Sequence, residues 1–194
     1  MRRAGLAPLA AVLLALTSGA AAQPRPAPVA FAGIPNLEIE YYDVLGRTAP
    51  EIRAAINRHP RRPRDPNDGL AMDALANWYL NWSWPATAGG RCDLARARIR
   101  FRARVLLPRL VEEARVPAPV LARWRSYIAA LETHEAGHIR FAYQRSGAVL
   151  AALRSSSCAR ANDDAAAAVA TINRHDVDYD RATHHGATEG ATFP

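Results

Sequence analysis

Alternating hydrophobic and polar residues predict β-strands in the first half of the chain. Residues Leu37 to Val44 alternate well enough to form a first strand. A second strand is expected where large apolar residues occupy every second position, at Trp78, Leu80, Trp82 and Trp84. A tryptophan stripe of this kind could stack on sugars or bases, but we interpret it as the core-facing side of a sheet.

The third predicted strand has the clearest pattern in the chain. From Arg96 to Val105, arginine alternates with alanine, isoleucine, phenylalanine and valine, and Pro108 ends the strand. One face must therefore meet water while the other is buried. We expect burial of Ile99, Phe101 and Val105. We expect exposure of Arg98, Arg100 and Arg102.

A period of three to four residues predicts helices between and after the strands. Thr48 and Glu51 form a capping-box pattern that opens a short helix over Ile52 to Arg58. From Pro119 to about Ser155, apolar residues recur at threes and fours, which predicts one long helix or two.

Gly137 and Gly147 are the points at which this helical segment could be interrupted. An alanine-rich helix is expected from about Asn162 into the 170s, followed by an irregular tail from Tyr179 to Pro194. Three strands followed by helices predict an α+β fold, in which a small antiparallel sheet packs on the long helix.

Residues 1–22 have the pattern of a secretory signal peptide. Arg2 and Arg3 provide a positive start, Leu6 to Leu16 is a short apolar run, and Ala20 to Ala22 is a small-residue cleavage site. The mature chain should therefore begin near Gln23. An uncleaved signal anchor is the alternative.

The mature chain is expected to comprise a proline-rich linker, residues 23–36, and one domain, residues 37–194. After signal cleavage, no segment is long and apolar enough for stable membrane insertion. We expect the mature protein to be periplasmic or secreted.

Cys92 and Cys158 are the only cysteines in the chain. In an oxidising compartment, two cysteines most simply form one disulfide bond. Two free buried thiols are the alternative.

The formal net charge of +7 overstates the charge of the mature protein, because Arg2 and Arg3 leave with the signal and reduce it to +5. All 25 basic residues are arginine. A basic surface can attract nucleic acid or anionic envelope polymers, but we interpret this charge as a solvated surface and expect no nucleic-acid partner.

The residues from His134 to His138 form an H-E-x-x-H motif inside the long predicted helix. Residues four apart lie above one another on one helix face, so the two imidazoles can converge on a single cation. A catalytic zinc ion takes three protein ligands and keeps one position open for water. The motif therefore predicts a zinc site with His134 and His138 as ligands.

Glu135 follows the first histidine and can reach a zinc-activated water without binding the metal itself. Zinc lowers the pKa of such a water towards about 7, so a carboxylate can take its proton during attack on a carbonyl. The same glutamate can deliver that proton to the leaving amine. We expect Glu135 to be the general base.

The third metal ligand must come from outside the motif. The metzincin pattern is excluded, because Phe141 and Gln144 occupy the positions of its glycine and third histidine. The only downstream glutamate is Glu189. The better candidates are His175, His184 and His185, with Asp180 close behind.

These motifs together resemble a family of bacterial secreted proteins, catalogued as a domain of unknown function and described as predicted secreted zinc-dependent proteases. The residues that carry the resemblance are Tyr41-Tyr42-Asp43-Val44 with Gly46, Trp78-x-x-x-Trp82, Cys92, Leu107-Pro108, Trp124-x-x-Tyr127, His134-Glu135-x-x-His138 and Tyr179-Asp180-x-x-Thr183-x-His185-Gly186. The resemblance covers nearly all of the mature chain, from about Leu37 to Phe193.

The resemblance implies a third ligand and supports the disulfide. Its closing motif implies that His185, the histidine before the glycine, completes the zinc site. His184 is an additional histidine, so an exchange between the two stays open. A disulfide between Cys92 and Cys158 would also fit the family.

Two residues before this histidine pair have candidate roles. Asp180 could orient a ligating histidine, because metal-bound imidazoles usually donate their other N–H to a carboxylate. Tyr179 could donate a hydrogen bond to the oxyanion of the tetrahedral intermediate. A hydrogen-bonded turn is the alternative interpretation for each.

The sequence thus predicts a zincin-like zinc peptidase that hydrolyses an amide bond in a peptide or protein substrate. One alternative keeps the zinc and acts on an amide in cell-wall material. The other is a non-catalytic envelope module with a structural metal. The intact Glu135 argues against that module, because a structural site has no use for a base there.

Overall fold

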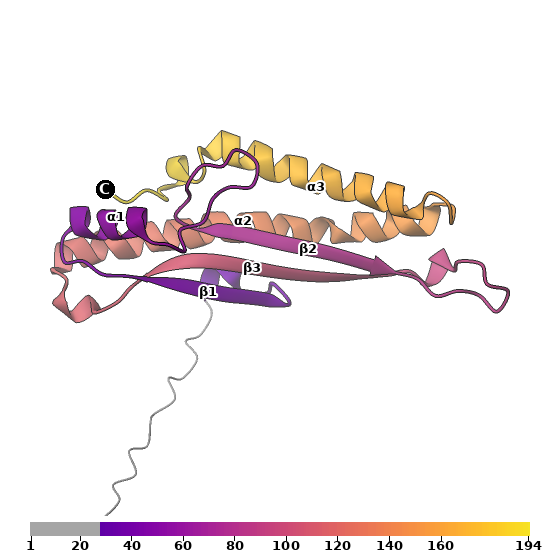
Figure 1. Ribbon diagram of the computed structural model, residues 1–194, viewed down its shortest axis with the longest axis horizontal. Helices are drawn as coiled ribbons and strands as arrows, with labels where there is room; N and C mark the ends of the chain where they lie inside the picture. The colour runs from indigo at the N-terminus through magenta and orange to yellow at the C-terminus, as the bar shows by residue number, and fades with distance from the viewer. Residues whose placement is uncertain (1–27) are drawn as a thin grey trace, which may run out of the picture.

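Strand β3 (Arg98–Leu110) lies at the centre of a three-stranded sheet, with β1 (Leu37–Val44) on one side and β2 (Leu75–Ser83) on the other. The computed structural model describes residues 28–194, in which three α-helices accompany the sheet (Figure 1). The predicted α+β class is confirmed.

The sheet is mixed, so the prediction of an antiparallel sheet was wrong for one pair of strands. β2 is antiparallel to β3, whereas β1 is parallel to it. The chain leaves β1, passes through helix α1 (Ala49–Arg58), returns along β2 and turns again into β3. Two reversals of direction make β1 and β3 parallel, and the long connection that parallel neighbours require is supplied by α1 and β2.

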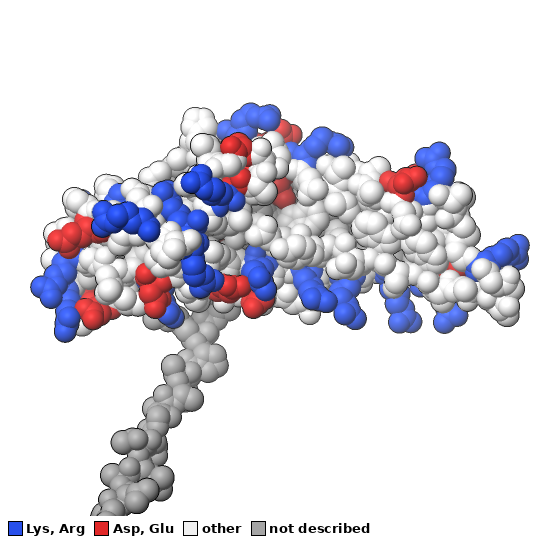
Figure 2. Space-filling model, in the orientation of Figure 1, with Lys and Arg blue, Asp and Glu red and all other residues white. Residues whose placement is uncertain are grey.

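The faces of β3 follow the predicted alternation. Phe101 and Val105 are buried, Ile99 is half-buried, and the arginines from Arg98 to Arg104 are exposed. Basic side chains project along the edge of the molecule where β2 and β3 lie (Figure 2). The hydrophobic half of each strand can therefore face the helices while the arginines stay in water.

The ends of β3 differ from the prediction. Arg96 belongs to a short 3₁₀ helix, η2 (Leu94–Arg96), and the strand begins at Arg98. It also continues past Pro108 to Leu110. Pairing with β2 reaches only Leu106, so beyond it one edge of β3 is unpaired, and proline is tolerated at such an edge.

Helix α2 (Ala118–Ser155) is one continuous helix that packs against the sheet and carries the H-E-x-x-H motif. Neither Gly137 nor Gly147 interrupts it. At Gly137 a Cβ atom would lie 3.0 Å from the hydroxyl oxygen of Tyr179, so this glycine allows the close approach of another element. The buried hydrophobic side chains of α2 include Trp124, Tyr127, Leu131, Ile139, Val149 and Leu153.

Helix α3 (Ala161–Thr183) follows a short turn and runs back along α2 (Figure 1). The prediction of an irregular tail from Tyr179 was therefore wrong for its first five residues. The helix ends where His184 adopts a left-handed backbone conformation with φ of 50°. The histidine and glycine residues that suggested a loop begin only at His184.

Two tryptophans of β2 connect the sheet to α3. The indole Nε1 of Trp78 donates a hydrogen bond to Asp176 Oδ2 at 2.6 Å, and that of Trp82 donates to Asn162 Oδ1 at 2.9 Å. Both rings pack against the hydrophobic core. The tryptophan stripe is thus a packing face, as predicted, and it fixes α3 beside β2.

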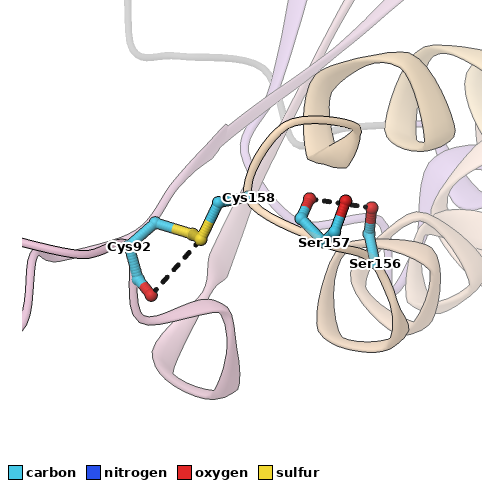
Figure 3. Close-up of a disulfide and its surroundings, with 4 residues drawn as sticks. All are labelled: Cys92, Ser156, Ser157 and Cys158. Atoms are coloured by element: carbon cyan, nitrogen blue, oxygen red, sulfur yellow. Dashed lines mark hydrogen bonds between the residues drawn. A yellow bond between two sulfur atoms is a disulfide. The ribbon is translucent and has the colours of Figure 1, made fainter.

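Cys92 and Cys158 form the predicted disulfide bond, with Cα atoms 5.9 Å apart (Figure 3). Cys158 follows Ser156 and Ser157 in the turn between α2 and α3, and Cys92 lies just before η2. The bond therefore joins the β2–β3 connection to the turn between the two long helices.

The first described residues pack onto the domain. Phe31, in the 3₁₀ helix η1 (Val29–Phe31), is buried, and Arg140 of α2 donates a hydrogen bond to the carbonyl oxygen of Ala30 at 2.6 Å. The predicted signal peptide and the first part of the predicted linker lie outside the described residues. Within residues 28–194, no helix is long and apolar enough to cross a membrane.

Candidate metal centre

His134, Glu135 and His138 lie on the face of α2 that is turned inward, and their exposed fractions are 3%, 6% and 8%. The four-residue spacing brings the two imidazoles together as predicted, with their Nε2 atoms 3.3 Å apart. Burial of two imidazoles side by side is unfavourable unless a cation or hydrogen-bond partners compensate.

The third atom of this group is a carboxylate oxygen from α3. Asp180 Oδ1 lies 3.1 Å from His134 Nε2 and 3.1 Å from His138 Nε2. A tetrahedral zinc ion with bonds of about 2.0–2.1 Å holds its ligands roughly 3.3–3.4 Å from one another. The three atoms therefore already have close to the spacing of zinc ligands, and together they form a group that could hold a metal ion.

The outer nitrogens of the two histidines also face carboxylates. His134 Nδ1 lies 2.9 Å from Glu189 Oε2, and His138 Nδ1 lies 3.2 Å from Asp176 Oδ1. A carboxylate at Nδ1 favours the tautomer with the proton on that atom, which leaves Nε2 free to bind a metal. Both imidazoles are thus oriented for ligation by groups behind them.

These two carboxylates are themselves held in place. Asp176 accepts the hydrogen bond from Trp78, and Glu189 accepts one from the Tyr179 hydroxyl at 3.0 Å. The Tyr179 ring also stacks on the His134 ring, with centroids 4.9 Å apart. In this structure Tyr179 contacts the histidine and the carboxylate that orients it, so the oxyanion role predicted for it requires its hydroxyl to leave Glu189.

Sequence reasoning missed Asp176 as an orienting residue and mentioned Glu189 only as a downstream glutamate. Asp176 and Asp180 are four residues apart, the same spacing as His134 and His138. This signal was visible in the sequence but has meaning only on a helix, and the tail was predicted to be irregular. Extension of α3 to Thr183 makes the two aspartates face α2 together.

His185 lies next to this group and belongs to a second group of potential metal ligands. Its Nδ1 is 3.7 Å from Asp180 Oδ1 and 3.9 Å from Asp65 Oδ2, and its Nε2 is 3.5 Å from Asp68 Oδ2. Asp65, Asp180 and His185 form a separate group that could hold a metal ion. The predicted ligation by His185 therefore stays a prediction, whereas Asp180, expected to orient a ligand, has the position of a ligand.

The other candidate histidines lie elsewhere. His184 is exposed and occupies the C-terminal cap of α3. His175 stacks on Phe141, with ring centroids 3.4 Å apart. In the part of the chain that the structure describes, neither belongs to a group that could hold a metal ion.

Glu135 lies beside the two histidines without belonging to their ligand group. The backbone of Ala76 in β2 lies close to its carboxylate. Burial raises the pKa of Glu135, and the neighbouring His138 and His134 only partly oppose this effect. A carboxylate with a raised pKa is a better proton acceptor than an exposed one, which suits the predicted general base.

The charges of the histidines depend on their carboxylate neighbours. Burial lowers the pKa of His138, but hydrogen bonds to Asp176 and Asp180 outweigh it and raise the pKa to about 10. For His134, burial also lowers the pKa, and Asp180, Glu135 and Glu189 reverse the direction. Burial acts to raise the pKa of Asp180, yet the two histidines hold it well below its usual range. The carboxylates around the group thus favour positive charge at its centre, as a metal site requires.

The group opens into a cleft of about 310 Å³ between α2, α3, the start of β2 and the loop that precedes β2. Carboxylates that line it are Asp65, Glu135, Asp176 and Asp180. Among the described residues, no arginine or lysine lines this cleft. The cleft is therefore suited to a cation and leaves room for a ligand beside it.

The fold and the site define a class: an α+β domain in which two helices bring histidine and aspartate side chains together as a potential metal centre. The chain belongs to a bacterial family, since the family model described as "Bacterial protein of unknown function (DUF922)" matches residues 39–186. No curated protein and no solved structure matches the chain. The family resemblance is confirmed, and the protease activity that it implied stays a prediction.

Proposed function

We propose that this protein is an exported zinc-dependent peptidase. The observation that carries the proposal is the triangle of His134 Nε2, His138 Nε2 and Asp180 Oδ1, with sides of 3.1 to 3.3 Å. Its dimensions and its two-nitrogen, one-oxygen composition suit a zinc ion with one open position. Under this proposal Asp180 takes the role that the family resemblance implied for His185.

When bound there, zinc would lower the pKa of a water molecule towards about 7 and polarise a substrate carbonyl. Glu135 accepts the proton of the attacking water and passes it to the leaving amine nitrogen. Asp176 and Glu189 keep the imidazoles of His138 and His134 in the orientation that ligation needs. The Glu135 carboxylate lines the cleft beside the two histidines.

The arrangement supports catalysis better than a purely structural metal site. Structural zinc sites are closed by four protein ligands, whereas this group supplies three and adjoins a cleft of about 310 Å³. A buried glutamate beside the metal would only add a desolvation cost to a structural site. The disulfide bond between Cys92 and Cys158 agrees with export to an oxidising compartment, the periplasm or the exterior.

Metal analysis of the purified mature protein, followed by digestion of a peptide library, tests this proposal. We expect tightly bound zinc and hydrolysis that a chelator abolishes and added zinc restores. Cleavage of cell-wall fragments but not peptides would redirect the proposal to a cell-wall amidase. Bound zinc without hydrolysis of either substrate class would favour a non-catalytic envelope module.

A further inference from the structure

A second set of metal-ligating atoms adjoins the first. It comprises Asp65, Asp180 and His185, whose ligand atoms all lie within 4.8 Å of one another. Asp180 belongs to both sets. The loop before β2 brings Asp65 to the cleft from a different part of the chain.

The Asp65 carboxylate is largely buried, and one of its oxygens faces His185. Its side chain is only 6% exposed. One carboxylate oxygen, Oδ1, accepts a hydrogen bond from the backbone N–H of Asn67 at 2.6 Å. The other, Oδ2, faces His185 Nδ1 at 3.9 Å. A cation in front of this oxygen would offset the cost of keeping a carboxylate on a largely buried side chain.

Hydrogen bonds within the loop hold the backbone around Asp65. The backbone N–H of Asp65 donates to the carbonyl oxygen of Leu70 at 2.9 Å, and Gly69 donates back to the carbonyl oxygen of Asp65 at 2.9 Å. At its end, Arg62 pairs with Asp73 at 3.0 Å. The loop that carries the Asp65 carboxylate is therefore held by contacts that do not involve His185.

His185 repeats the pattern of the two histidines in the first set. One ring nitrogen, Nδ1, faces the ligand group, while the opposite nitrogen, Nε2, lies 3.5 Å from Asp68 Oδ2. His134 and His138 likewise have one nitrogen towards the group and the other towards a carboxylate. A carboxylate behind the ring is the usual support of a metal-bound imidazole.

We propose that Asp65, Asp180 and His185 form a second cation site, so that the Asp180 carboxylate bridges two metal ions in the cleft. A histidine nitrogen beside two carboxylates suits a divalent transition metal such as Zn²⁺ better than Mg²⁺ or Ca²⁺. The lining of the cleft offers four carboxylates and, among the described residues, no arginine or lysine to neutralise them.

This inference deepens the proposed function and rests on it, because Asp180 is shared. In hydrolases with paired metal ions about 3.5–4 Å apart, the pair stabilises both the attacking and the leaving oxygen. A second ion beside the first would therefore assign this protein to the two-metal hydrolases. It also gives His185 a metal-binding role that differs from completion of the first site.

The test is the number of zinc ions bound by the whole mature chain. Chelator-treated protein is titrated with ZnCl₂ alone, and bound zinc is counted by mass spectrometry of the metal after removal of excess. We expect two ions in the wild type, one in Asp65→Asn and one in His185→Gln. Asp163→Asn, an equivalent change at an exposed position on α3, should retain two.

The two substitutions lie on different segments, so misfolding of the loop cannot mimic the result in both, and circular dichroism checks the fold of each. One ion in the wild type and one in both variants would overturn the second site and leave the proposed function intact. No bound zinc in the wild type would overturn both. One ion in the wild type that either variant removes would place a single metal at His185, against the bridged pair.

Discussion

Gly186 lies directly against the imidazole ring of His134. Its φ of +78° belongs to the left-handed region, and a Cβ atom there would lie 2.9 Å from His134 Cγ. The backbone N–H of Gly186 donates to the Thr183 hydroxyl at 3.1 Å. This contact lets the tail turn over the first histidine of the motif and brings Glu189 to its Nδ1 atom.

Substitution Gly186→Ala should therefore loosen the support of His134. We expect a loss of about 1–3 kcal/mol in the free energy of unfolding, because a left-handed alanine is strained and its methyl group must displace the ring. Zinc affinity should fall as well, since Glu189 would leave its position behind His134. Thermal unfolding in chelator and zinc titration measure the two effects.

Gly147→Ala is the matched control. Gly147 lies within α2, and no described atom outside the helix backbone lies within 4 Å of the position of its Cβ. Alanine should leave zinc affinity unchanged there and stabilise the helix by about 0.5–1 kcal/mol. Equal effects of the two substitutions would contradict the close contact between Gly186 and His134.

The ligand assignment predicts an order among three alanine substitutions in the tail. Asp180→Ala should remove the most zinc, because its carboxylate belongs to both ligand groups. His185→Ala should remove only part of it, and His184→Ala should remove none, since His184 is an exposed helix cap. Zinc content of the three purified variants checks the order. Complete loss in His185→Ala with retention in Asp180→Ala would restore the assignment that the family resemblance implied.

The alternation of β3 predicts a sharp difference between neighbouring residues. Phe101 is 6% exposed and packs in the core, so Phe101→Ala should lower the free energy of unfolding by about 3–5 kcal/mol. Arg100 is exposed, and Arg100→Ala should change it by no more than about 0.5 kcal/mol. Urea denaturation of both variants tests the pair. Similar losses would show that the faces of the strand are assigned wrongly.

Asp73 predicts a pH dependence that does not involve the metal centre. Burial acts to raise the pKa of Asp73, but hydrogen bonds from Arg53 and Tyr127 outweigh it and lower the pKa below the usual value. A carboxyl group with a lowered folded-state pKa stabilises the fold above its unfolded pKa of about 3.9, and this stabilisation is lost as the pH falls through the folded-state pKa.

The stability difference between the wild type and Asp73→Asn should therefore be largest near neutral pH and shrink below about pH 4. Urea denaturation of both proteins in chelator across this range measures it, and carboxyl groups common to the two cancel in the difference. A difference that stays constant down to pH 2 would show that the charge of Asp73 contributes nothing.

Local patterns predicted much of the fold, because they report burial and helix capping directly. The alternation around Phe101 set the faces of β3, and Thr48 with Glu51 set the start of α1, where both capping-box hydrogen bonds are present. The direction of β1 relative to β3 was not predictable in this way, because the side-chain pattern of a strand is the same in parallel and antiparallel pairs.

The candidate site likewise contains residues that a local pattern predicts and residues that only the tertiary structure brings together. His134, Glu135 and His138 act through spacing within one helix, so the sequence alone places them together. Asp65 reaches the cleft, and Glu189 reaches His134 Nδ1, through loop and tail conformations that no local pattern encodes. Asp180 was named as a candidate, but its position as a third ligand depends on how α3 packs on α2, which is a tertiary property.

The central claim is that the cleft binds zinc for catalysis, with Glu135 as the general base. Glu135→Gln tests it most directly, because the amide keeps the shape of the side chain and leaves every proposed ligand in place. We predict unchanged zinc content and a fall in the rate of peptide hydrolysis by a factor on the order of 10² or more, the scale of lost general-base catalysis. Full hydrolytic activity in the zinc-loaded Glu135→Gln protein would contradict the account.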